Sequence, residues 1–147
     1  MPVDASGFDL ERFVEAQQGV YAQALREIEA GEKRSHWMWF IFPQVSGLGS
    51  SSMAQRYAIG GRDEAVAYLR HPVLGPRLRE ITAAVNAVNG RSLDAVFGYP
   101  DDLKFHSSMT LFAEASVAMS PEETAFQDAL GKWFGGKKDE ATLRLLW

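Results

Sequence analysis

Lys104, Ser107 and Ser108 form a polar cluster whose residue types and spacing could do chemistry. The serines follow the lysine by three and four residues, so on a helix one ammonium group and two hydroxyls would lie near one another. A serine nucleophile would also need an activated base and an oxyanion hole, and the sequence shows neither. The cluster therefore favours phosphate or carboxylate binding over covalent catalysis. A crossing of small helical residues beside a solvated lysine is the simpler alternative.

The loop 47–52, which reads Gly-Leu-Gly-Ser-Ser-Ser, is a second candidate for holding an anion. It follows an apolar run, as in a dinucleotide-binding fingerprint, but Ser52 stands where that pattern requires glycine and Pro43 interrupts the approach. A doubly wound sheet would also need several strands, and the chain offers one doubtful candidate. Backbone amides of residues 49–53 at a helix N-terminus could still hold an anion, although an ordinary glycine loop explains the same residues.

The three histidines, at positions 36, 71 and 106, are the remaining candidates for acid–base or metal chemistry. The sequence has no cysteine, no close pair of histidines and no carboxylate at ligand spacing, so it predicts neither a metal site nor a cofactor. His36 directly precedes Trp37 and could be partly buried with a pKa near neutrality. If the protein is an enzyme, His36 is the candidate general acid or base.

Two hypotheses for function follow from these residues. The first is a pocket that binds a small anionic ligand, such as a nucleotide or an ADP-ribose-like metabolite. The second is a non-catalytic helical module that presents a surface to a protein partner. Convergence of the polar groups in a concavity would favour the first hypothesis, and their scatter would favour the second. The candidate ligand-binding residues are Lys33, Gln44, Gly47, Gly49, Lys104, Ser107 and Ser108.

The elements that must position these residues are predicted to be helices. Apolar residues at three- and four-residue spacing predict a helix over 9–31, capped by Asp9 and ended by Gly31. The apolar run from Trp37 to Phe42, closed by Pro43, predicts a short buried helix at the centre of the core, with a buried strand as the alternative.

Further helices are predicted between turn signals along the rest of the chain, and Asp63 and Asp139 are predicted to cap the helices that begin at residues 64 and 140. Because no linker or repeat divides residues 1–147, we expect one domain: an all-α, multihelical globule of about six to eight helices with an ordered core over about 9–146. The expected helical ranges are 53–59, 64–70, 76–88, 92–97, 101–118, a helix that starts at the capping box 120–123 and runs through 134, and 140–146.

Composition limits the classes of partner. A formal net charge of -4 with no basic cluster longer than two residues argues against nucleic acid. The sequence begins without the basic and apolar segments of a signal peptide, and its longest apolar run is too short to span a membrane. We therefore expect a soluble, cytoplasmic protein without a membrane partner.

Five motifs are specific enough to compare with known families: Lys33-x-Ser-His-Trp-Met-Trp-Phe-Ile-Phe-Pro-Gln44, Gly47-Leu-Gly49, His71-Pro72-x-Leu74-Gly75-x-Arg77-Leu78, Phe97-Gly98-x-Pro100-Asp101 and Lys104-x-x-Ser-Ser-Met-Thr-Leu-Phe112. Together they resemble the bacterial domain-of-unknown-function family 1810, over about residues 10–146. The resemblance implies a multihelical, single-domain fold and no established activity. Automated transfer sometimes labels such proteins calpastatin, but that inhibitor is a disordered repeat protein, whereas this chain is 46% hydrophobic and 12% aromatic.

Overall fold

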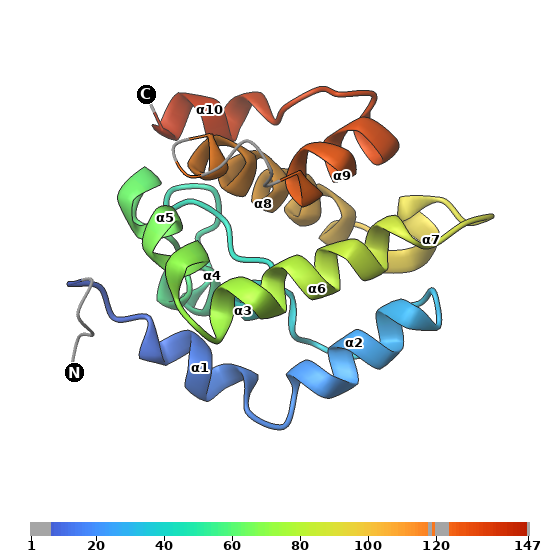
Figure 1. Cartoon of the computed structure of the whole chain (residues 1–147), viewed down its shortest axis with the longest axis horizontal. Coiled ribbons are helices and arrows are strands. Elements are labelled where there is room, and N and C mark those ends of the chain that lie inside the picture. The colour runs from blue at the N-terminus through green and yellow to red at the C-terminus, as the bar shows by residue number, and fades with distance from the viewer. Residues whose placement is uncertain (1–6, 118, 120–123, 147) are drawn as a thin grey trace.

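The computed structural model describes residues 7–117, 119 and 124–146, and in these residues it is helical, with ten helices and no β-strand (Figure 1). The all-α prediction is confirmed, but the number of helices exceeds the predicted six to eight. No helix in the described residues is long and apolar enough to cross a membrane. The helices are α1 (Glu11–Gln17), α2 (Tyr21–Glu29), α3 (Met38–Ile41), α4 (Ser52–Arg56), α5 (Arg62–Arg70), α6 (Leu74–Asn86), α7 (Leu93–Phe97), α8 (Asp101–Ser116), α9 (Ala125–Phe134) and α10 (Glu140–Leu146).

The prediction of one continuous helix over 9–31 is wrong, because the chain turns between α1 and α2. Helix α1 ends at Gln17, and Gly19 adopts a φ of 70°, in the left-handed region that glycine tolerates best. The Gln17 side chain turns inward and donates a hydrogen bond to the carbonyl oxygen of Phe40 at 2.8 Å. Asp9 does not cap the helix: Leu10 occupies the N-cap position, without a side-chain capping bond.

The short helix α3 lies in the core, as the aromatic run predicted. Figure 1 shows it near the middle of the molecule. Trp37 and Phe42, which flank it, have no exposed surface, and Phe42 packs edge-on against Phe97 and Phe105 with ring centroids 5.8 and 5.1 Å apart. Trp39 differs from its neighbours because its side chain is only half-buried. The buried-helix prediction is confirmed, and one tryptophan of the run is left at the surface.

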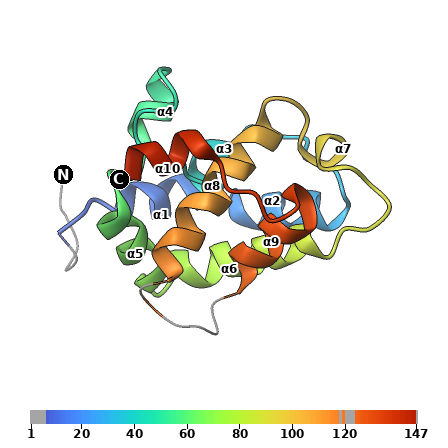
Figure 2. The same cartoon turned by 90° about the horizontal axis from the view of Figure 1, so that it is seen from above.

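Helix α8 is the long central helix, with α5, α7, α9 and α10 packed around it (Figure 2). It begins at Asp101 as predicted and ends at Ser116, two residues before the predicted end. Ser107 and Ser108 lie on its buried surface. Because its N-terminal turns also face the loop before α4, this helix can bring the 104–107 region to the glycine-rich segment.

Side chains that accept backbone hydrogen bonds start several of the helices. Asp139 caps α10 as predicted, since its Oδ2 accepts from the Thr142 amide at 3.1 Å. Ser92 caps α7 in the same way, and the His71 ring accepts from the Val73 and Leu74 amides at the start of α6. Asp63 lies in the first turn of α5 instead of capping it. The predicted capping box 120–123 lies outside the described residues.

Gly75, in the first turn of α6, packs directly against the backbone of the last turn of α5. A Cβ atom there would lie 2.1 Å from the Leu69 carbonyl oxygen, which is backbone and cannot move without shifting a helix. We expect Gly75→Ala to lower the free energy of unfolding by about 3 kcal/mol, measured by urea denaturation. Gly131→Ala in α9 is the matched control: a Cβ there meets nothing, and alanine should add up to about 1 kcal/mol. A Gly75→Ala variant as stable as the wild type would contradict this packing.

Candidate functional site: a cavity between the loop before α4 and helices α8 and α10

A cavity of about 430 Å³ lies where the loop before α4 meets the N-terminal ends of α8 and α10. Its size falls in the range of small-molecule sites. Its walls come from four parts of the chain: α3, the loop with the first residues of α4, the first turns of α8, and the start of α10. The lining residues are Trp39, Gln44, Leu48, Gly49, Ser50, Ser51, Ala54, Pro100, Leu103, Lys104, Ser107, Asp139 and Ala141.

Four of the candidate ligand-binding residues meet in this cavity: Gln44, Gly49, Lys104 and Ser107. Gln44 and Gly49 precede Lys104 and Ser107 by more than fifty residues in the sequence, so the tertiary fold brings the two pairs together. Lys104 and Ser107 are one helical turn apart on α8, which places both on the cavity side of that helix.

The other three ligand-binding candidates and His36 lie elsewhere. Gly47 lines a neighbouring cavity, and Lys33 pairs with Asp101, which also contacts Lys104. Ser108 has no exposed surface, since one residue along a helix rotates the side chain by about 100° from Ser107 and into the core. His36 is exposed and is not a lining residue of the cavity.

Lys33 and Lys104 share the carboxylate of Asp101. The Lys33 ammonium lies 2.8 Å from Asp101 Oδ2, and the Lys104 ammonium lies 3.5 Å from Asp101 Oδ1. The Lys33 side chain is only 8% exposed, whereas that of Lys104 is 27% exposed. Two positive charges thus meet one negative charge, and Lys104 is the looser and more accessible partner.

The Lys104 ammonium also contacts the ring of Trp39. Lys104 Nζ lies 5.2 Å from the centre of the Trp39 ring, within the range of a cation–π contact. Both side chains line the cavity, and the Lys104 side chain remains partly exposed beside the indole. The sequence predicted Trp39 as a core residue and so missed this role.

Asp139 contributes a carboxylate that the sequence identified only as a helix cap. Its Oδ2 accepts hydrogen bonds from the Thr142 hydroxyl at 2.6 Å and the Thr142 amide at 3.1 Å. The Ser107 hydroxyl lies 3.1 Å from the same oxygen. Oδ1 accepts no hydrogen bond from the described part of the chain. The cavity lining therefore contains one ammonium group and one carboxylate that can accept further donors.

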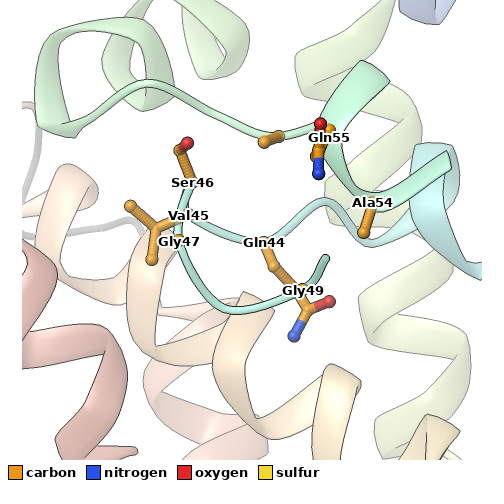
Figure 3. A pocket seen from close by; sticks show the side chains of 8 residues that line it. Gln44, Val45, Ser46, Gly47, Gly49, Ala54 and Gln55 are labelled. Atoms are coloured by element: carbon orange, nitrogen blue, oxygen red, sulfur yellow. The ribbon is translucent and has the colours of Figure 1, made fainter. Parts of the chain in front are cut away.

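A second cavity, of about 390 Å³, adjoins the first (Figure 3). Two backbone bonds brace its wall: Ser46 donates to Ile59 at 2.7 Å, and Ile59 donates to Gln44 at 2.9 Å. The Gln44 side chain itself makes no hydrogen bond within residues 7–117, 119 and 124–146. The lining residues are Gln44, Val45, Ser46, Gly47, Gly49, Ala54, Gln55 and Ala58.

Comparison with known proteins gives a family and one similar fold. The family model described as "Protein of unknown function (DUF1810)" matches residues 7–146. The crystal structure of the conserved hypothetical protein Rv1873 from Mycobacterium tuberculosis is similar, with 55% sequence identity and a TM-score of 0.90 over 95% of this chain and 96% of that chain. No curated protein matches the sequence.

Proposed function

Because the chain belongs to DUF1810, a family of unknown function, its role must be argued from the site itself, and we propose that the first cavity binds a small anionic ligand. Family membership confirms the resemblance predicted from the sequence motifs. The proposal concerns binding. It includes no reaction, since His36, the candidate acid or base, is exposed and outside the lining.

The position of Lys104 carries the proposal. Its ammonium lies in the cavity wall, and Lys33 has the nearer contact with Asp101, so the two lysines and Asp101 together carry one net positive charge. A phosphate or carboxylate beside Lys104 would supply that missing charge in a partly desolvated position, where ion pairing is stronger than at an open surface.

Gln44 and Asp139 indicate what else the ligand carries. The Gln44 amide can donate to an anionic oxygen or accept from a hydroxyl. Asp139 repels an anion but accepts hydrogen bonds through Oδ1, so the part of the ligand near it should bear hydroxyl or amine donors. The lining thus suits a molecule with an anionic group at one end and donor groups beside it.

Inorganic phosphate is the simplest probe of this site. We expect its binding, followed by NMR titration of backbone amides, to shift residues around Lys104 and to weaken as salt is added. Lys104→Ala should lower the affinity at least about tenfold, because the ammonium supplies the charge–charge term. Its melting temperature should change little, since the side chain is partly exposed and its ion pair with Asp101 is long.

Arg70→Ala is the matched control, because it removes the same unit of charge from an exposed residue outside the lining. If Arg70→Ala lowered phosphate affinity as much as Lys104→Ala does, the loss would be explained by net charge alone. That result would contradict a phosphate site at Lys104. Absence of any phosphate-induced shift in the wild type would reject the proposal.

A protein-interaction module is the second candidate function, favoured by two apolar side chains near the cavity. Tyr99 is 77% exposed and Leu103 is 51% exposed, and they stand four residues apart where α8 begins. Exposed aromatic and aliphatic groups in such proximity are common at binding surfaces. If this module is the function, Tyr99→Ser should reduce partner binding or self-association, and phosphate should not bind in the wild type.

A further inference from the structure

The two cavities share a wall. Gln44, Gly49 and Ala54 line both of them, so the two spaces are next to one another. In Figure 3 the Gln44 side chain leaves the backbone on the side away from Ser46 and Gln55. A ligand larger than one cavity could therefore extend past Gln44 into the other.

Small side chains keep this wall thin. A Cβ atom on Gly49 would lie 2.6 Å from the Cβ of Ala54, so residue 49 must be glycine for the loop to pack against α4 as it does. Only Gln44 contributes a long side chain to the shared wall, and its amide is not held by a hydrogen bond within the described residues. The Gln44 side chain can therefore change rotamer without breaking a hydrogen bond in that part of the chain.

The two cavities differ in chemistry. The first contains the Lys104 ammonium and the Asp139 carboxylate. The second has no charged residue among the described residues that line it, and its polar side chains are Ser46, Gln44 and Gln55. Each of these can both donate and accept a hydrogen bond. A neutral group with alternating donors and acceptors, such as the edge of a nucleobase, matches this lining, whereas a second anion does not.

We propose that the two cavities form one bipartite site for a nucleoside monophosphate. The inference rests on the proposed anion site and specifies its ligand. The phosphate lies at Lys104, the ribose hydroxyls donate to Asp139, and the base occupies the neutral cavity beside Gln44 and Gln55. Each cavity, at about 430 and 390 Å³, has the volume of a small-molecule site.

Binding measurements with AMP, GMP, CMP, UMP, ribose 5-phosphate and inorganic phosphate test this assignment. We expect at least one nucleotide to bind about tenfold or more tightly than ribose 5-phosphate, because only the nucleotide fills the neutral cavity. Ala58→Leu, which fills only that cavity, should remove this advantage and leave phosphate affinity unchanged. Ala141→Leu, the matched substitution in the first cavity alone, should weaken both phosphate and nucleotide.

The outcomes separate the two proposals. If phosphate binds through Lys104 but no nucleotide binds more tightly than ribose 5-phosphate, the bipartite site is overturned and the anion site stands. If Ala58→Leu leaves the nucleotide advantage intact, the base lies elsewhere and the assignment is also overturned. If neither phosphate nor any nucleotide binds, both proposals fall.

Gln55→Ala provides a second readout should Ala58→Leu fail to fold. Gln55 is exposed, lines only the neutral cavity and makes a local bond from its amide to the Ser50 carbonyl at 2.8 Å. Its truncation should lower nucleotide affinity about threefold or more and leave phosphate affinity unchanged. Equal nucleotide affinity in Gln55→Ala and wild type would count against the base position.

Discussion

Trp37→Ala should lower the free energy of unfolding by about 4–5 kcal/mol, measured by urea denaturation. The Trp37 side chain has no exposed surface, and its ring packs against Phe42 and Phe97 with centroids 6.2 and 6.5 Å away. Its indole N–H also donates to a buried carboxylate, Glu27, at 3.0 Å. The substitution therefore leaves a large cavity and removes one of the hydrogen bonds to the Glu27 carboxylate.

Two further variants separate the contributions of ring packing and of the indole hydrogen bond to this loss of stability. Trp37→Phe keeps most of the ring volume and removes the indole donor, so it should cost less than Trp37→Ala and chiefly report the bond to Glu27. Trp39→Ala should also cost less, because Trp39 is half-buried, and its main effect should be on phosphate binding. If Trp37→Ala and Trp39→Ala lowered the free energy of unfolding equally, the difference in burial between the two side chains would be contradicted.

Glu27 is the second residue whose loss should have a large effect. Its carboxylate is buried and organises the turn that leads from α2 into α3. The hydrogen-bond donors to it are the Arg34 amide at 2.7 Å, the Ser35 amide at 3.0 Å, the Ser35 hydroxyl at 2.7 Å, the Trp37 indole at 3.0 Å and the Gln23 amide group at 3.0 Å.

These donors set the ionisation of Glu27. Burial on its own raises the pKa of the carboxyl, but the bonds from Arg34, Ser35, Trp37 and Gln23 outweigh it and lower the pKa from 4.5 to about 2. A carboxyl whose pKa is lower in the folded state stabilises the fold above the unfolded pKa. That stabilisation, on the order of 3 kcal/mol, is lost as pH falls from about 4.5 toward 2.

Glu27→Gln should therefore cost about 3 kcal/mol at pH 7 and flatten the decline of stability between about pH 4.5 and 2. Urea denaturation at a series of pH values measures both effects. Glu29→Gln is the matched control, since Glu29 is exposed on the same helix, and it should change neither quantity appreciably. If the free energy of unfolding of Glu27→Gln fell as steeply with pH in this range as that of the wild type, the role assigned to this carboxylate would be contradicted.

The local sequence pattern was sufficient to predict most of the helices and the buried position of α3. A run such as Trp37–Phe42 has to be shielded from water wherever it lies, and Pro43 limits its length without reference to the rest of the chain. The same reasoning failed at Gly19, because an apolar spacing that continues across a glycine cannot show whether the backbone turns there. The two short helices meet at that turn so that Gln17 can reach the Phe40 carbonyl.

The sequence by itself determined the helical class of this protein and the placement of Lys104 and Ser107 one helical turn apart, because both depend on interactions within a few residues. Only the tertiary structure decided which serine faces the cavity, which lysine is buried against Asp101 and that Trp39 and Asp139 belong to the site. Those outcomes depend on how α3, α8 and α10 pack, and packing is set by contacts between segments many residues apart. A pattern in any one segment cannot specify such contacts, and this is the physical reason that Asp139 could be identified from the sequence only as a helix cap.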